Sequence, residues 1–132
     1  MESGLITKNS PHDVDATYEK LRTILSNNPN LKILLELDHS KNAASVDLKL
    51  NPTKIIMFGN PKLGTPLMQA SSSIGIDLPQ KILVYTGSDG NAVVAYNDPL
   101  YLAKRHDLEG VEAILEKVSG ALNNITNKVI EE

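Results

Sequence analysis

Apolar residues recur along the chain with two periods, one typical of helices and one typical of strands. The longest helical pattern lies at the C-terminal end and predicts a final helix of about five turns, with Asp107 as its N-cap. Its apolar stripe consists of Val111, Ile114, Leu115, Val118, Ala121, Leu122, Ile125 and Val129. A second stripe follows Asp13, another expected N-cap, and predicts a helix that ends before Asn27.

Alternating and continuous apolar runs predict the strands. Leu31 to His39 alternates, so Leu31, Ile33, Leu35 and Leu37 are expected to share one face. Shorter runs at residues 4–8 and 48–50 predict two further, weaker strands, and residues 40–47 predict a short helical turn. A turn after Asp98-Pro99 is expected to be helical as far as Arg105, since proline suits the first position of a helix.

A hairpin is expected where residues 81–86 and 92–96 flank an Asp-Gly pair. If Asp89 and Gly90 form a two-residue turn, Tyr85 lies opposite Val94 and Leu83 lies opposite Tyr96. Both faces of this hairpin are then largely apolar. We therefore expect the hairpin to be covered on both faces, either by helices or by a second subunit.

The central feature is the stretch from Lys54 to Thr65, where a continuous apolar strand runs into a glycine-rich segment. We expect a loop up to a helix that begins at Thr65-Pro66. Such a loop offers free amides to an anion, so its candidate ligand contacts are Gly59, Asn60, Lys62, Gly64 and Thr65. The phosphate-binding loop of nucleotide triphosphatases is excluded because Thr65-Pro66 stands where that motif needs lysine and Ser/Thr. The alternative is a tight connection without a ligand.

Two histidines are candidate catalytic groups, because imidazole suits proton transfer near neutral pH. His39 ends the predicted strand at 31–39, and His106 ends the short helix after Pro99, beside Arg105. The alternative is that both are structural. The histidine spacing does not support a metal site, and we predict no cofactor, although histidine ligation of haem or a metal stays open.

Composition limits the classes of function. The chain has 132 residues, a formal net charge of −3 and no cysteine or tryptophan. A nucleic-acid partner is not expected, because such proteins usually carry a basic stripe and aromatic stacking residues. No apolar run approaches the roughly 20 residues of a membrane helix, so no membrane partner is expected either. We expect one cytoplasmic domain over residues 1–132.

A series of short motifs resembles a known family. Asp38-His39, Phe58-Gly59-Asn60-Pro61-Lys62, Gly64-Thr65, Leu78-Pro79, Tyr96, Asp98-Pro99 and Arg105-His106 are together similar to the uncharacterised bacterial and archaeal domain-of-unknown-function family 302. The resemblance implies an α+β fold of β-α-β(4)-α type, similar to the TATA-binding protein. In this plan a curved antiparallel sheet of about five strands carries a long C-terminal helix, with extra helical segments after Thr65 and Asp98. It also implies a homodimer, and Tyr96 and Arg105 complete the candidate ligand contacts.

Three functions remain open at this point. The leading one is a dimeric small-ligand-binding domain with its pocket near residues 59–65, lined also by His39 and His106. The second is an enzyme that uses His39 or His106 as general acid–base. The third is a structural or interaction protein without a ligand.

Overall fold

The chain folds as an α+β domain around one five-stranded antiparallel sheet. The structure, a computed structural model, describes residues 3–132. Its strands are β1 (Leu5–Asn9), β2 (Lys32–Asp38), β3 (Thr53–Gly59), β4 (Gln80–Thr86) and β5 (Ala92–Asn97), in the sheet order β1-β5-β4-β3-β2. Its helices are α1 (Val14–Ser26), α2 (His39–Ala44), α3 (Pro61–Ala70), the short 3-10 helix η1 (Ser72–Ile76), α4 (Pro99–Arg105) and α5 (Glu112–Val129). The β-α-β(4)-α plan is confirmed, with α2, α3, η1 and α4 as additions.

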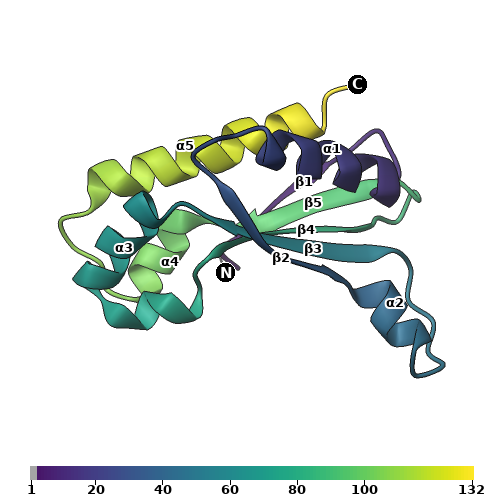
Figure 1. The fold of residues 1–132 in the computed structure, drawn as a ribbon, viewed down its shortest axis with the longest axis horizontal. Coiled ribbons are helices and arrows are strands. Elements are labelled where there is room, and N and C mark those ends of the chain that lie inside the picture. The colour runs from purple at the N-terminus through teal and green to yellow at the C-terminus, as the bar shows by residue number, and fades with distance from the viewer. Residues whose placement is uncertain (1–2) are drawn as a thin grey trace.

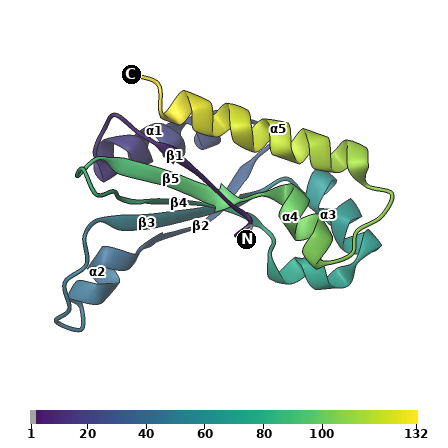
Figure 2. The same ribbon diagram turned by 180° about the vertical axis from the view of Figure 1, so that it is seen from behind.

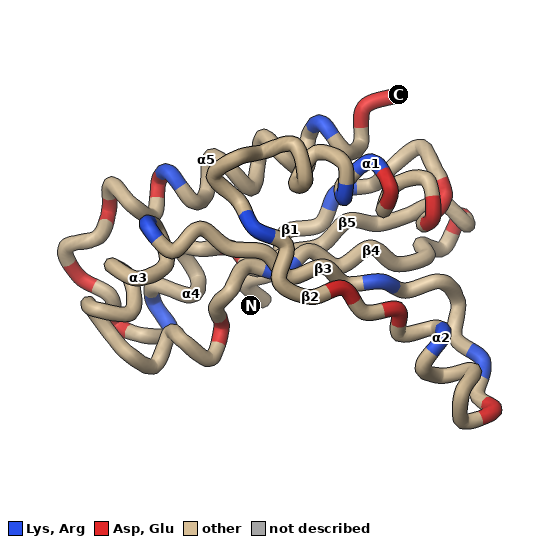
Figure 3. The backbone as a smooth tube through the Cα atoms, in the orientation of Figure 1, with Lys and Arg blue, Asp and Glu red and all other residues tan. Residues whose placement is uncertain are grey.

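Helices α1 and α5 cover one face of the sheet, while α2 and the pair α3 and α4 lie at opposite ends (Figures 1 and 2). The register places Glu36, Ile56, Ile82 and Tyr96 in one row across β2 to β5, on the helix-covered face. This face and the apolar stripe of α5 form the main core, in which Ile56, Ile82 and Leu122 are buried. Positive and negative side chains are interspersed along residues 3–132 (Figure 3).

The opposite face of the sheet is apolar and partly exposed. Here the adjacent row consists of Leu37, Ile55, Leu83 and Ala95. Within residues 3–132, no helix lies across the middle of this face (Figures 1 and 2). We call this side of the sheet the open face.

The expected alternation in β2 is interrupted by a bulge. The register shifts between Ile33, which pairs with Phe58, and Leu35, which pairs with Met57. Because one extra residue reverses the side-chain direction, Ile33 packs against the core whereas Leu35 and Leu37 lie on the open face. The expectation that these leucines share one face with Ile33 was wrong. The strand also ends one residue early, since the Asp38 carboxylate caps α2 by accepting from the amide of Lys41.

The hairpin register also differs from the prediction by one residue. Tyr85 pairs with Val93, and Thr86 pairs with Ala92. The turn is not a two-residue one: the Gly87 amide donates to the Asn91 carbonyl at 2.8 Å, and Gly90 between them has a φ of 86°. A left-handed glycine closes a three-residue loop of this kind. Val94 and Tyr96 therefore face the helices, and Val93 faces the open side.

The caps of the helices were predicted in part. Asp13 caps α1 and Asp98 caps α4, each accepting a backbone amide as expected. Asp107 does not cap α5; it adopts a φ of 51°, and the helix begins five residues later, at Glu112. The apolar stripe of α5 is confirmed, with Leu115, Val118, Leu122, Ile125 and Val129 buried.

Lys8 joins the first strand to the last helix. Its ammonium donates to Thr126 Oγ1 at 2.7 Å and to the side-chain oxygens of Asn123 and Asn127, each at 2.8 Å. These three acceptors are neutral, so none of them offsets the loss of hydration of the charged ammonium. Burial therefore lowers the pKa of Lys8.

Gly120 gives a test of the α5 assignment. It lies exposed inside the helix, and a Cβ placed on it would meet no atom within 4 Å. We expect Gly120→Ala to raise the free energy of unfolding by about 0.5–1 kcal/mol, because alanine loses less backbone entropy in a helix. Urea denaturation measures the change. A loss of stability would contradict the placement of Gly120 on the exposed side of a regular helix.

Candidate functional site

The segment Gly59 to Thr65 is mostly helix, not loop. Helix α3 begins at Pro61, directly after Asn60, whose side chain accepts from the Lys62 amide at 3.1 Å. The prediction of a helix start at Thr65-Pro66 was therefore wrong. Both Asn60-Pro61 and Thr65-Pro66 have the residue types of a cap followed by proline, and the first of them caps the helix.

This helix start changes the chemistry expected of the segment. The amides of Leu63 and Gly64 donate to the Asn60 carbonyl at 2.9 and 3.0 Å, and the Lys62 amide is bonded to the Asn60 side chain. Pro61 carries no amide hydrogen. Of the amides that were expected to bind an anion, those of Lys62 and Gly64 are thus already used within the segment.

The same segment forms one wall of a cavity of about 340 Å³. The other walls come from the start of β2, the end of β3, the start of β4 and one side of α5. Of the predicted ligand contacts, Gly59, Asn60, Gly64 and Thr65 line this cavity. Lys62 does not line it and is exposed on the first turn of α3.

The inner surface of the cavity is apolar. Phe58, Leu67 and Leu122, each only 2% exposed, line it together with Val118 and Ile125 of α5. Polar residues contribute at four positions, namely Lys32, Asn60, Thr65 and Gln80. A volume above 300 Å³, an apolar wall and a few polar groups are typical of small-molecule sites.

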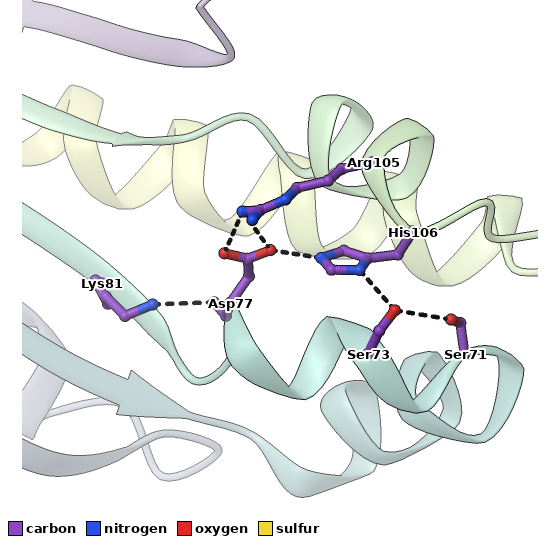
Figure 4. Close-up of polar contacts among 6 residues, drawn as sticks. All are labelled: Ser71, Ser73, Asp77, Lys81, Arg105 and His106. Atoms are coloured by element: carbon purple, nitrogen blue, oxygen red, sulfur yellow. Dashed lines mark hydrogen bonds and ion pairs between the residues drawn. The ribbon is translucent and has the colours of Figure 1, made fainter.

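A second cluster joins α4 to η1 and is separate from the cavity (Figure 4). His106 Nε2 lies 2.5 Å from Asp77 Oδ2, and His106 Nδ1 lies 2.7 Å from Ser73 Oγ. Arg105 Nη1 donates to both oxygens of the Asp77 carboxylate, at 3.1 and 3.2 Å. The His106 side chain is only 6% exposed, while Ser73 is exposed.

The arrangement of serine, imidazole and carboxylate can move a proton between the hydroxyl and the ring. It equally fixes η1 against α4, because both ring nitrogens of a buried histidine have partners. Arg105 was predicted as a ligand contact, but it pairs with Asp77 and does not line the cavity.

The remaining predicted residues lie elsewhere. His39 begins α2, at the end of the sheet opposite α4, so His39 and His106 lie far apart (Figures 1 and 2). The expectation that both line a pocket near residues 59–65 was wrong, since neither lines the cavity. Tyr96 is 4% exposed within the main core, where burial raises the pKa of its hydroxyl.

Sequence reasoning missed Asp77 and Ser73. They lie 29 and 33 residues from His106, at a spacing that matches no catalytic motif. Within residues 3–132, no group of three or more His, Asp or Glu side chains lies close enough together to hold a metal ion.

Comparison with known proteins identifies the family. A family model described as "Domain of unknown function DUF302" matches residues 6–125. The chain belongs to the DUF302 family. A DUF302 crystal structure from Bacillus stearothermophilus, of an uncharacterized conserved protein, superposes with a TM-score of 0.84 at 17% identity, covering 97% of this chain and 99% of that one. This likeness shows that the DUF302 fold is shared.

Three curated relatives carry the name of a channel. The "Fluoride-specific ion channel FluC 1" of Brucella suis biovar 1 (strain 1330) is 38% identical over 108 residues, or 82% of this chain and 42% of the relative. "Fluoride-specific ion channel FluC 2" of Brucella melitensis biotype 1 (strain ATCC 23456 / CCUG 17765 / NCTC 10094 / 16M) matches equally over 40% of its length. The chain thus spans about two fifths of these relatives, whose names describe the whole proteins. Among residues 3–132, the helices are too short or too polar to span a bilayer.

Proposed function

We propose that this DUF302 chain is a small-ligand-binding domain that works as a homodimer, with its ligand in the cavity beside α3. The observation that carries the proposal is the cavity itself, at about 340 Å³, next to the segment that the sequence singled out. The proposed contacts are Gly59, Asn60, Gly64 and Thr65. A cytoplasmic location stays a prediction from the sequence.

A variant that fills the cavity tests this function. A Cβ on Gly64 would lie 3.9 Å from its nearest neighbour, Leu78 Cδ1, so a side chain there is accommodated and extends into the open volume. We would screen the full chain against a fragment collection by ligand-observed NMR, and compare Gly64→Leu with Gly120→Leu. Gly120 is also a helical glycine, but it does not line the cavity.

Fragments that bind the original chain and Gly120→Leu but not Gly64→Leu would support the proposal. Fragments that bind all three proteins equally, or a screen without any binder, would contradict it. The second result would favour the structural or interaction role that the sequence also left open.

The homodimer is proposed to form through the open face of the sheet. Leu35, Leu37, Ile55 and Leu83 lie in neighbouring positions there, and Leu35 is 45% exposed. Apolar patches of this kind commonly mark interfaces, and a two-fold dimer uses the same patch on both copies. The family resemblance independently implies a homodimer.

A single charge should therefore separate the two copies. We expect Leu35→Lys to convert a dimer into a monomer while the fold is retained, because this side chain is already half exposed in one copy. Size-exclusion chromatography with light scattering measures the mass. Ile76→Lys is the matched control, since Ile76 is 74% exposed on η1 and does not belong to a strand of the sheet. A dimer that survives Leu35→Lys would overturn the choice of interface.

One observation favours an enzyme as the second candidate function. His106 is bonded to Asp77 on one nitrogen and to the exposed Ser73 hydroxyl on the other, as a general base for that hydroxyl requires. The test is turnover of nitrophenyl esters by the original chain, Ser73→Ala and His106→Asn. Turnover that both substitutions abolish supports this candidate, whereas turnover that is absent, or unaffected by either, removes it.

A further inference from the structure

The cavity beside α3 has an apolar inner wall and polar residues at its rim. We propose that it takes an apolar molecule with a single anionic end, whose apolar part lies against α5 and whose anionic end lies beside Lys32. This inference rests on the proposed ligand-binding function and names the class of ligand.

The inner wall favours an apolar body. Phe58, Leu67 and Leu122 are buried core residues that also line the cavity. An apolar wall of this kind favours the apolar part of a ligand, because contact with it removes apolar surface from water. The first-turn amides of α3 are already bonded within the helix, so the wall has few groups for a compact polar ligand such as an inorganic anion.

The charge at the cavity is positive. Lys32 is the one charged residue among those lining it, and it lies beside Gly59 in the β2–β3 ladder. Within the part of the chain that the structure describes, the Lys32 ammonium forms no ion pair or hydrogen bond. Because no Asp or Glu from residues 3–132 lines the cavity, this ammonium favours an anionic partner.

Asn60 adds a donor at the same end. Its side-chain oxygen accepts from the Lys62 amide, so the NH2 group is the part of the side chain that remains for a ligand. A carboxylate, sulfonate or phosphate end would accept from both Lys32 and Asn60. A cationic end would be repelled by Lys32.

Three probes with straight alkyl chains of seven or eight carbons separate the apolar part from the charge. We would titrate the full chain near neutral pH with octanoate, octanol and octyltrimethylammonium, following the backbone amide signals of Gly59, Gly64 and Thr65 by NMR. We expect octanoate to bind about three- to tenfold more tightly than octanol, as one interaction with an exposed charge allows. Octyltrimethylammonium should bind most weakly.

Two lysines provide a matched pair of variants. Lys32→Gln is expected to weaken octanoate to the level of octanol and to leave octanol unchanged. Lys62→Gln removes an equal charge from the first turn of α3, outside the cavity, and should change neither. Gly64→Leu should weaken all three probes.

The outcomes distinguish this inference from the function on which it rests. Equal binding of octanoate and octanol, or tighter binding of the cationic probe, would overturn the anionic end while leaving an apolar ligand site in place. If none of the probes shifts the three amide signals but fragments from the screen bind in a Gly64-dependent way, the ligand class is wrong and the proposed function stands. If the fragments fail as well, both are wrong.

Discussion

Leu122→Ala is expected to lower the free energy of unfolding by about 2–5 kcal/mol. Leu122 is 2% exposed and packs in the main core between α5 and the sheet. Removing its branched end loses buried apolar surface and leaves a hole that joins the existing cavity, which Leu122 also lines. Urea denaturation measures the change.

The matched control for this substitution is Leu100→Ala. Leu100 lies in α4 and is 55% exposed, so its truncation should change the free energy of unfolding by less than about 0.5 kcal/mol. A cost below about 1 kcal/mol for Leu122→Ala would mean that α5 is not packed against the sheet as described. The inner wall of the proposed ligand site, which α5 contributes, would then be wrong as well.

Asp77→Ala is expected to cost about 2–4 kcal/mol of stability. The Asp77 carboxylate is 13% exposed and is the partner of His106 Nε2, so its removal leaves a buried ring nitrogen without that bond. Arg105 loses its pairing with the same carboxylate, but it is half exposed and regains water. The measurement is the midpoint and slope of a denaturation curve.

A double-mutant cycle with His106→Ala separates the pair from each residue alone. We expect a coupling of at least about 1 kcal/mol, because the two side chains are in direct contact with little solvent between them. Asp15→Ala is the control: its pair with Lys54 is also short, at 3.0 Å, but Asp15 is 76% exposed and such pairs contribute little. Equal costs for the two aspartates would contradict the buried character of the Asp77 pair.

The amphipathic elements could be predicted from the sequence because their signals are local. The stripe of α5, the Asp13 cap of α1 and the five strands each depend on residues within one short window. The further strand predicted at residues 48–50 was wrong, since this short run forms no strand and leads into β3. The two register errors, in β2 and in the β4–β5 hairpin, arose because the local sequence is compatible with more than one backbone conformation. A bulge in β2 reverses two leucines, and a left-handed Gly90 selects a three-residue hairpin loop over a two-residue one.

The sequence singled out the segment that borders the cavity, but not the bonds that the backbone of this segment makes. The glycine-rich segment does border the cavity, yet the amides of Lys62, Leu63 and Gly64 are bonded to Asn60 at the start of α3. Part of the apolar inner wall of the cavity comes from α5, which lies beside this segment because of tertiary packing. Asp77 and His106 are 29 residues apart in the chain, so their contact produces no local sequence pattern.

The contacts of Lys8 have a consequence for how the chain is made. Its partners Asn123 and Asn127 follow it by 115 and 119 residues, and β1 pairs with β5. A ribosome therefore releases the first strand long before any of its partners exist. Contacts of such long sequence separation slow folding, so we infer that β1 stays unpaired until β5 has been synthesised and that Lys8 reaches its acceptors only after α5 has followed.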